Sequence, residues 1–509
     1  MGRVDPARTR TRRRCATGAR TRARLGLGLA ITVLAGCTAT GGGLTAGSGG
    51  RGAGADGVGD PYFPLMGNGG YDVTHYDLAL AYAPKTRHLT GTATLTARAT
   101  ADLTAFNLDL LGLTVRSVTV DGASARVARD GQELTVRPRA ALTRGEEFRT
   151  TVRYAGRPRT ITDPDGSEEG WLPTADGALA LGQPTGSMAW FPGNHHPGDK
   201  AAYDIAVTVP EGLTAVSGGE LRSTRTVDGR TTFDWHGAEP QASYTATVAI
   251  GRYRVGTSRI DADRLTEDDG IKATDGRREL SVYNAVDPQV AAAARKPLSR
   301  LPAIMAWAER TFGPYPFSAT GAIVDRDGDA GYALETQTRP VYPGAPDPVL
   351  IVHELAHQWY GDSVTPRTWR DMWLNEGFAT YAEWLWDEEH GGRTAQSVFD
   401  ALYRGDYYDE PGADAAVWAF PPAAPPSAAD VSQAPVYQRG AMVLHQVRRT
   451  VGEGAFREVL RGWPTVHRYG TVDTAAFTAY VERVAPRHRG ALRRVWATWL
   501  HGEGKPSRP

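Results

Sequence analysis

Cysteine is almost absent from this sequence, which has only Cys15 and Cys37 among its 509 residues. Both lie within the first 37 residues, so the remainder of the chain has no disulfide bond and no thiolate metal site. Any metal ion bound by the folded part of the protein must therefore be held by histidine and carboxylate side chains.

A membrane-spanning run is also lacking near the N-terminus, where the apolar stretch LGLGLAITVLAG covers only residues 25–36. A transmembrane helix needs roughly 20 apolar residues. An arginine-rich segment between Arg3 and Arg24 precedes the stretch, and this order is typical of a signal peptide. We therefore expect residues 1–36 to direct export, while the route, general secretory or twin-arginine, stays open.

The cysteine that follows has the sequence context of a lipid-attachment site. Residues 34–37, LAGC, resemble the bacterial lipobox, in which the cysteine is lipidated and becomes the new N-terminus. The alternative is a cysteine without a function. The sequence thus predicts a lipoprotein anchored through Cys37 to the outer face of the cell membrane, with a glycine-rich tether over residues 37–60.

Charge of one sign does not dominate, because 57 basic residues balance 57 acidic ones. Nine of the arginines lie in the first 36 residues, so the rest of the chain has 48 basic and 56 acidic residues, a net charge of −8. A mildly acidic protein offers no basic surface of the kind that binds phosphate backbones. We therefore expect no nucleic-acid partner.

Two domains are predicted after the tether. Residues 61–256 contain short runs of alternating apolar and polar residues, such as LTGTATLTARA (89–99), and these favour an antiparallel β sandwich or saddle. Residues 257–509 mix strand and helix patterns, which indicates an α+β domain. Strands are expected at 319–327 and 331–342, and helices at 297–313, 347–361 and 368–392, the last with a Thr368 to Asp371 capping box.

The pentapeptide HELAH at 353–357 carries the most chemical information. Residues four apart lie on one face of an α-helix, so His353 and His357 can direct two imidazole rings at one metal ion. Glu354 lies to one side of that face, where it can reach a water molecule on the metal. The alternative is that both histidines are ordinary core residues.

The next expected helix supplies a third candidate ligand. Glu376 follows His357 after 18 intervening residues. Two packed helices would bring its carboxylate to the open side of the histidine pair, which gives two histidines, one glutamate and a free fourth position, as in catalytic zinc sites. Glu383 lies one heptad further on, either as a hydrogen-bond acceptor for a ligand histidine or as a solvated carboxylate.

The stretch 353–384 resembles the signature of the aminopeptidase N family of zinc metallopeptidases (peptidase family M1, gluzincins), H-E-x-x-H-x18-E within W-L-N-E-G-F-A. Three other segments resemble motifs of the same family: YALETQ (332–337) its G-A-M-E-N strand, PVYQRGAMVLHQVRRTVGEGAF (435–456) its Y-E-K-G helix, and WFPGNHHPGDKAAYDIAVTVP (190–210) its F-P-x-x-D-x-P segment. The resemblance covers nearly all of residues 61–509. It implies an N-terminal β saddle domain followed by a thermolysin-like zinc catalytic domain.

The resemblance also implies roles for individual residues. One zinc ion per chain would be held by His353, His357 and Glu376. Glu354 would take a proton from the attacking water and pass it to the leaving amine. Tyr437 would donate a hydrogen bond to the oxyanion of the tetrahedral intermediate.

Peptide substrates would be recognised by their free N-terminus. The resemblance places Glu335 against the substrate's ammonium group, with Gln183 as the second contact. Most members of the family have glutamate at the position of Gln183, so we expect weaker anchoring of the amine here.

Other positions depart from the family pattern. Tyr332 and Thr336 replace the outer glycine and asparagine of G-A-M-E-N, and His195 stands where aspartate is usual. Only about seventy residues follow Tyr437, so we expect the large helical C-terminal domain of longer members to be absent. We expect a more open active site.

The sequence thus predicts a lipid-anchored zinc aminopeptidase. Two alternatives remain open: an endopeptidase or epoxide-hydrolase activity on the same zinc, and a non-catalytic surface-binding protein on the peptidase fold. The sequence indicates no oligomeric state.

Overall fold

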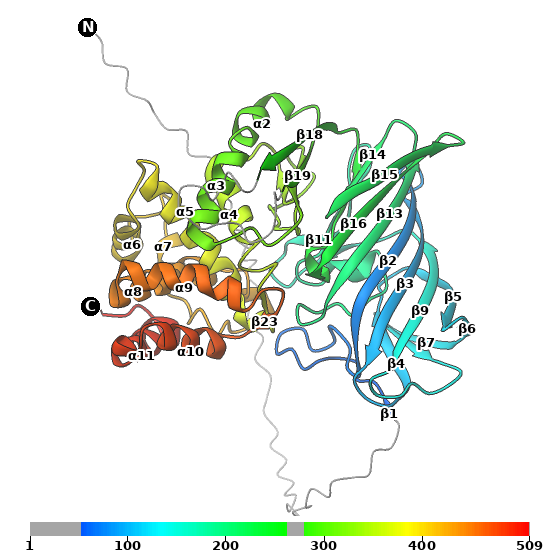
Figure 1. Cartoon of the computed structure of the whole chain (residues 1–509), viewed down its shortest axis with the longest axis horizontal. Coiled ribbons are helices and arrows are strands. Elements are labelled where there is room, and N and C mark those ends of the chain that lie inside the picture. The colour runs from blue at the N-terminus through cyan, green and yellow to red at the C-terminus, as the bar shows by residue number, and fades with distance from the viewer. Residues whose placement is uncertain (1–51, 262–278, 508–509) are drawn as a thin grey trace, which may run out of the picture.

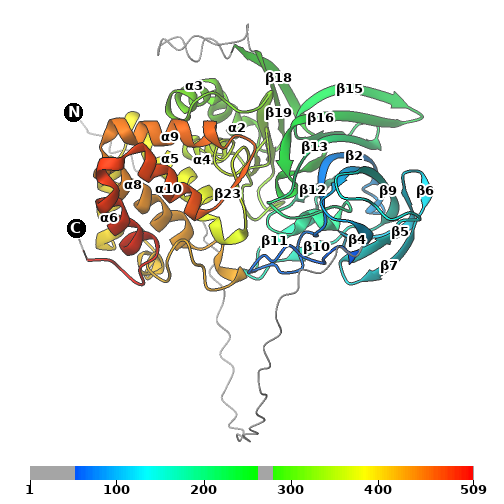
Figure 2. The same cartoon turned by 60° about the horizontal axis from the view of Figure 1, so that its bottom comes forward.

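A computed structural model describes residues 52–261 and 279–507 of the chain. The predicted signal peptide, Cys37 and the first part of the predicted tether lie outside the described residues. Figure 1 shows strands gathered in one half of the molecule and helices in the other, and Figure 2 shows the same division from a second direction.

The first half is built around one large twisted sheet. Its eight strands in spatial order are β15 (Glu220–Val227), β16 (Arg230–Ala242), β13 (Lys200–Pro210), β2 (Tyr71–Ala83), β3 (His88–Ala99), β9 (Glu147–Gly156), β5 (Thr114–Val120) and β6 (Ala123–Ser124). The alternating pattern of KAAYDIAVTVP in β13 sends every second side chain into the core. Neighbours run antiparallel except β13 and β2, which pair in parallel.

Two smaller sheets complete the β half. One contains β10 (Thr160–Thr162), β11 (Glu168–Pro173), β12 (Ala178–Leu181), β17 (Val248–Gly251) and β14 (Thr214–Ser217), and the other β1 (Gly52–Ala53), β4 (Leu103–Asp109), β8 (Glu133–Arg137) and β7 (Arg126–Asp130). Aromatic rings fill the space between the sheets: Tyr76 stacks on Tyr203 at 4.9 Å and meets the edge of Phe191. The predicted β saddle or sandwich is confirmed.

The second half combines a mixed sheet with helices, which confirms the predicted order of a β domain followed by an α+β domain. The sheet contains β18 (Arg254–Asp261), β19 (Glu279–Val286), β20 (Ala319–Asp325) and β21 (Val341–Pro343). In Figures 1 and 2, β18 and β19 lie between the helices and strands β13–β16. A short parallel pair, β22 (Thr365–Pro366) and β23 (Thr471–Val472), joins two loops.

The α-helices of this half are α2 (Ala291–Leu298), α3 (Leu301–Phe312), α4 (Pro348–Ala356), α5 (Trp373–Glu389), α6 (Ala395–Arg404), α7 (Ala413–Ala416), α8 (Gly440–Val451), α9 (Glu453–Val466), α10 (Thr474–Val484) and α11 (Arg489–Val495). Two π-helical turns, η6 (Pro435–Arg439) and η8 (Trp496–Leu500), precede α8 and follow α11. Short 3₁₀ turns are η1 (Gly186–Ala189), η2 (Ser243–Thr245), η4 (Trp369–Asp371), η5 (Ala428–Asp430) and η7 (Pro486–His488).

Two local predictions were wrong. The strand expected at 331–342 is mostly irregular: only β21 and one bridge, Leu334 to Val341, are formed, because the chain turns at Thr338, whose φ is +67°. The expected capping box is not formed either. The hydroxyl of Thr368 donates to the carboxylate of Asp371 at 3.3 Å, residues 369–371 form a 3₁₀ turn, and α5 begins only at Trp373.

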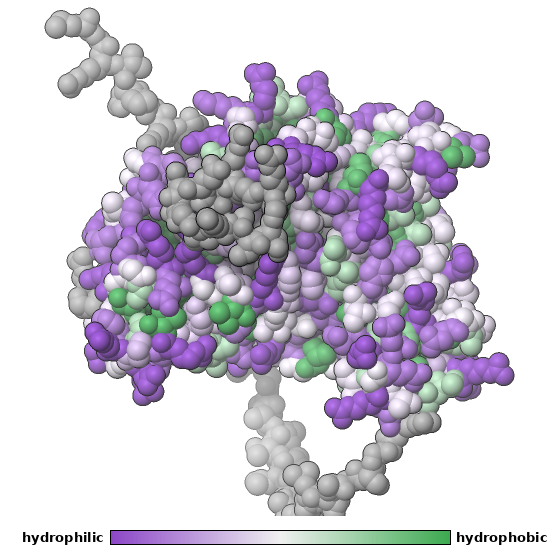
Figure 3. All heavy atoms as spheres, viewed as in Figure 1, coloured by the Kyte–Doolittle hydropathy of each residue, from purple (hydrophilic) through white to green (hydrophobic). Residues whose placement is uncertain are grey.

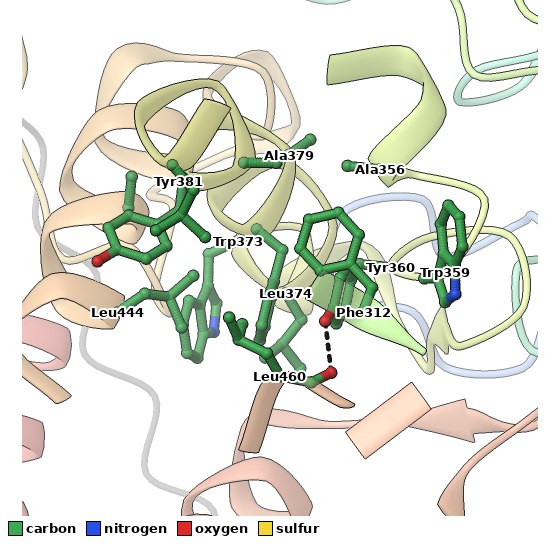
Figure 4. Packing of buried hydrophobic residues seen from close by; sticks show 14 of the residues in the cluster. Phe312, Ala356, Trp359, Tyr360, Trp373, Leu374, Ala379, Tyr381, Leu444 and Leu460 are labelled. Carbon is green, nitrogen blue, oxygen red and sulfur yellow. Dashed lines mark hydrogen bonds between the residues drawn. The ribbon is translucent and has the colours of Figure 1, made fainter. Parts of the chain in front are cut away.

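Aromatic packing fixes the positions of α4 and α5. Figure 4 shows the buried rings of Phe312, Tyr360 and Trp373 packed between these helices and α9. Tyr360, four residues beyond α4, stacks on Phe378 of α5 with ring centroids 4.2 Å apart. Its hydroxyl donates to the carbonyl of Leu460 in α9 at 2.6 Å. The end of α4 is thereby held against two other helices.

The segment before β2 crosses from one half of the molecule to the other. Residues 52–54 bond to the β4 strand region, which differs from the tether predicted up to residue 60. Asp60 then accepts backbone N–H bonds from Tyr62, Phe63 and Trp369 at 2.8, 3.0 and 3.0 Å, and faces Nε2 of His196 at 3.3 Å. Trp369 belongs to the helical half and His196 to the β half, so this one carboxylate ties them together.

None of the helices among the described residues is both long enough and apolar enough to cross a bilayer. The face seen in Figure 3 is mostly polar, with apolar residues in small separate patches.

We predict that Asp60→Ala lowers the free energy of unfolding by about 3 kcal/mol, because four buried donors lose a charged acceptor. Burial raises the pKa of Asp60, but the hydrogen bonds from His196 and the backbone lower it below 3.8. Because the carboxylate of Asp60 has a lowered pKa in the folded state, its ionisation stabilises the folded protein above pH 3.8. This stabilisation is lost as the pH falls further, so the difference in unfolding free energy between wild type and Asp60→Ala should narrow in acid.

Urea unfolding at pH 7 and pH 3 measures both effects. Asp77→Ala, at an exposed position of β2, is the matched control and should stay within about 0.5 kcal/mol of wild type. Equal losses for both variants at pH 7 would show that Asp60 does not join the two halves.

Candidate active site

The two histidines lie at the C-terminal end of α4: His353 is in the helix and His357 directly follows it as the C-cap. Asp347 caps the N-terminus of α4 by accepting from the backbone N–H groups of Val349 and Leu350, both at 2.8 Å, as the sequence predicts. His353 and His357 are buried on one face, with ring centroids 4.7 Å apart and ring planes at 78°. Their Nε2 atoms therefore converge on one point beside the helix.

Helix α5 brings Glu376 to that point. Its Oε2 lies 3.3 Å from Nε2 of His353 and 3.5 Å from Nε2 of His357. The three ligand atoms lie within 4.8 Å of one another, and this buried oxygen makes no well-formed hydrogen bond to any residue that the structure describes. Two imidazoles and one carboxylate are the donor set of a catalytic zinc site, so these residues fit a zinc ion.

Hydrogen bonds orient both imidazoles. Nδ1 of His353 bonds to Oε1 of Glu383 at 2.7 Å, and Nδ1 of His357 faces the carbonyl of Tyr360 at 3.2 Å and Oδ1 of Asn375. Carboxylate, carbonyl and amide oxygens only accept, so Nδ1 carries the hydrogen and Nε2 keeps a lone pair for a metal. Glu383 is therefore a hydrogen-bond acceptor for His353 and not a solvated carboxylate, the other alternative that the sequence left open.

The pKa values show how strongly the pocket favours positive charge. Burial disfavours the charged form of His353, but the nearby carboxylates of Glu376 and Glu383 raise its pKa to about 9. Burial likewise opposes ionisation of Glu376, yet His357 and His353 lower its pKa to about 2. Buried carboxylates that stay ionised need a cation beside them, which a divalent metal ion supplies.

Glu354 has a different environment, although it is the next residue after His353. It is buried, and burial raises its pKa to about 7 even though both histidines lower it. Its carboxylate comes within 4.8 Å of ligand atoms of Glu335 and His357. A carboxylate with a pKa near neutrality can both accept and return a proton, as a general base must.

Tyr437 lies beside His353. Its ring is parallel to that imidazole, with centroids 6.4 Å apart and planes at 10°. Burial, together with the negative charges of Glu376 and Glu335, raises the pKa of its phenol well above 10.0. The hydroxyl therefore keeps its proton and can donate a hydrogen bond.

A buried arginine holds the π-helical turn that carries Tyr437. Arg439 donates to the carbonyls of Trp499 at 2.9 Å, Phe420 at 3.3 Å and Thr498 at 3.4 Å, and also to that of Gly502. Sequence reasoning did not identify Arg439. Its only signal was the basic residue of the Y-E-K-G motif.

Glu335 and Gln183 also lie together in this site. Nε2 of Gln183, from the loop after β12, donates to Oε1 of Glu335 at 3.2 Å, and Nδ2 of Asn375 donates to the same oxygen at 2.9 Å. Burial raises the pKa of Glu335. Gln358, next to His357, contacts the backbone of the segment 335–338 at two points. Its Nε2 faces the carbonyl of Glu335 at 3.5 Å, and its Oε1 accepts from the N–H of Thr338 at 2.7 Å.

The departures from the family pattern have different surroundings. Tyr332 borders the site, and its hydroxyl donates to the carbonyl of Gln183 at 3.3 Å. Thr336 turns away and bonds to the carbonyl of Arg339. His195 is a core residue of the β half: it packs against Phe191, bonds to that residue's carbonyl at 3.0 Å, and burial lowers its pKa to about 4. The imidazole of His195 is therefore neutral at this buried position.

Comparison with known proteins places the chain in a family. The family model for the Peptidase M1 N-terminal domain matches residues 73–245, and that for the Peptidase family M1 domain matches residues 347–499. Together the two matches span more than half of the sequence. The chain belongs to peptidase family M1, which confirms the resemblance inferred from its motifs.

Individual curated relatives have low sequence identity to this chain. The chain is 23% identical over 332 residues to tricorn protease-interacting factor F2 of Thermoplasma acidophilum (63% of this chain, 40% of that protein). It is 24% identical over 307 residues to aminopeptidase N of Rattus norvegicus (55% of this chain, 30% of that protein). The matches thus span less than half of the length of these curated relatives.

Solved structures match over their whole length. The M1 zinc metallopeptidase of Deinococcus radiodurans superposes with a TM-score of 0.78 at 29% identity, covering 89% of this chain and 98% of that one. A variant of that enzyme bound to a Tyr-Ser-Ala substrate gives the same TM-score and identity, with 99% of its chain covered.

We predict that Glu383→Ala lowers the affinity for zinc about 10- to 100-fold, because His353 loses the acceptor that orients its ring. Competition with a fluorescent chelator measures the dissociation constant. Glu458→Ala, on the exposed side of α9, is the control and should bind zinc as wild type does. An unchanged affinity for Glu383→Ala would contradict the role of this hydrogen bond.

Proposed function

We propose that this chain is a zinc-dependent aminopeptidase that removes N-terminal residues from peptides. One observation carries the proposal: the set of metal-ligating side chains, a carboxylate with a near-neutral pKa, a protonated tyrosine and the carboxylate of Glu335 all lie in one buried site. Membership of peptidase family M1 and the substrate-bound structure of a relative support the same reaction class.

The proposed cofactor is one zinc ion held by His353, His357 and Glu376. Bound there, zinc supplies Lewis acidity, which lowers the pKa of a water molecule and polarises a peptide carbonyl. With zinc in place, Glu354 would accept a proton from the attacking water through its carboxylate and return it to the nitrogen of the leaving amine.

Tyr437 stabilises the charge that develops on the carbonyl oxygen. Because its pKa is raised by burial and by nearby carboxylates, the phenol is neutral and donates its O–H. Arg439 fixes the turn that carries the phenol, so the donor is in place before substrate arrives.

Glu335 defines the N-terminal end of the substrate. Its buried carboxylate has two amide donors, from Gln183 and Asn375, and it is the charged group available to pair with an ammonium. Gln183 can accept one hydrogen bond from the same ammonium through Oε1 but adds no charge. The adjoining segment, residues 331–336, is proposed to pair with the peptide backbone.

The alternatives are less well supported. An endopeptidase or epoxide hydrolase on the same zinc is motivated by the neutral Gln183, which weakens selection for a free amine. A surface-binding protein without activity has no need for the intact set of ligands, general base and tyrosine. The complete site therefore favours catalysis.

Cleavage of matched peptides with free and acetylated N-termini tests the proposal. The wild type should cleave free-amine peptides in preference to acetylated ones, because only the former carry the ammonium. Glu335→Ala should lower kcat/KM on free amines about 10- to 100-fold, the equivalent of one charge-assisted hydrogen bond. Gln183→Glu should lower KM on free amines by adding a negative charge.

Glu354→Gln provides the control for contaminating activity. It should keep the metal, since the ligands remain, but lose turnover on every substrate. Equal wild-type rates on free and acetylated peptides would overturn the aminopeptidase assignment in favour of the endopeptidase.

We further propose that the protein is an exported lipoprotein held on the outer face of the cell membrane through Cys37. The signal-like segment 1–36 and the LAGC sequence support this location. We predict that the wild type partitions into the detergent phase of Triton X-114 and that Cys37→Ser moves to the aqueous phase or retains its leader. Cys15→Ser is the matched control, and a wild type found wholly in the aqueous phase would overturn the anchor.

A further inference from the structure

One amide side chain contacts both functional parts of the site. Asn375 lies on α5 directly before Glu376 and is 0% exposed. Its Oδ1 accepts from Nδ1 of His357, a proposed metal ligand. Its Nδ2 donates to Oε1 of Glu335, the proposed amine anchor, at 2.9 Å. The metal position and the amine position are therefore joined through a single planar group.

The orientation of this amide is determined by its two partners. Nδ1 of His357 also faces the carbonyl of Tyr360 at 3.2 Å, so it carries a hydrogen and requires an acceptor from Asn375. The carboxylate of Glu335 can only accept while it is ionised, so it requires a donor. A flipped amide would place a donor against a donor and an acceptor against an acceptor.

The loop after α4 is shaped to leave room for this amide. Gly361 has φ +137°, and a Cβ at this position would lie 2.1 Å from Oδ1 of Asn375. Any residue larger than glycine would thus push the amide from its partners. Glycine at position 361 is therefore favoured both by its positive φ and by the position of the Asn375 amide.

We propose that Asn375 is a positioning residue that sets the metal-ligating imidazole of His357 and the carboxylate of Glu335 relative to each other. This inference rests on the proposed function. Asn375 touches neither the metal nor the scissile bond. It determines how far the substrate's ammonium lies from the metal, and hence which peptide bond reaches the reacting centre.

The first test measures zinc and substrate separately. Asn375→Leu, which is close in size but has no polar atoms, should lower zinc affinity about 10- to 100-fold by chelator competition. At saturating zinc it should also reduce the preference for free-amine over acetylated peptides, seen as a raised KM. Asn375→Asp restores an oxygen acceptor beside the ligand histidine and should regain wild-type zinc affinity.

A double-mutant cycle isolates the contact with Glu335. In a Glu335→Ala chain, Asn375→Leu should cause no further loss of free-amine preference, because its partner is already gone, while the loss of zinc affinity persists. Gly361→Ala should weaken both zinc binding and free-amine preference by displacing the amide. Gly391→Ala is its control, since Gly391 also has positive φ (+77°) but open space around a Cβ.

The outcomes separate this inference from the proposed function. The inference is overturned if Asn375→Asp does not regain zinc affinity. It is also overturned if the effects of Asn375→Leu and Glu335→Ala on free-amine preference are additive, or if Gly361→Ala binds zinc and selects free amines as Gly391→Ala does. A wild type that binds no zinc, or cleaves free and acetylated peptides equally, overturns the proposed function itself, and with it this inference.

Discussion

The site depends on how closely α5 approaches two other helices. On one side, Tyr360 stacks on Phe378 and holds the end of α4 against α5. On the other, Gly377 meets Gly440 at the start of α8, where a Cβ would lie 3.0–3.1 Å from backbone atoms. These contacts bring Glu376 between the histidines of α4 and the π-helical turn that carries Tyr437. A larger residue at Gly377 would separate the acid ligand from the tyrosine without altering either.

Close packing of these helices brings several carboxylates together in a buried pocket, which costs electrostatic free energy. Other groups of the site offset this cost. Glu335, Glu354 and Glu376 are all buried, and like charges in a pocket of low polarity disfavour one another. Two imidazoles and several amide donors stabilise them in part, and a divalent cation would do so further. The β half also contributes, because Gln183 reaches the site from its edge. Substrate recognition is thus shared between two domains, while the metal ligands all come from two adjacent helices.

The sequence allowed prediction of what is local and periodic. His353 and His357 lie on one helical turn, and Glu376 lies on the next helix, so spacing alone brought the three ligands together. Glu335 and Tyr437 were found only through family resemblance, because their approach depends on tertiary packing. Asn375 and Arg439 stand inside the family motifs but were missed, since their hydrogen bonds to residues far away in the sequence leave no periodic pattern. The strand expected at 331–342 failed at Thr338, whose backbone conformation is imposed by contacts with Gln358 and Gly219.

Asp60 gives the N-terminal segment a part in the architecture that its glycine-rich composition does not suggest. The carboxylate receives hydrogen bonds from His196 in the β half and from Trp369 in the helical half. Phe63, three residues later, packs its ring against Trp369 with centroids 5.9 Å apart. A pulling force applied to the chain ahead of β2 would therefore act on the seam, that is, on the contact between the two domains, rather than on either domain alone. A shortened protein that starts at β2 would lose this brace and expose the seam to water.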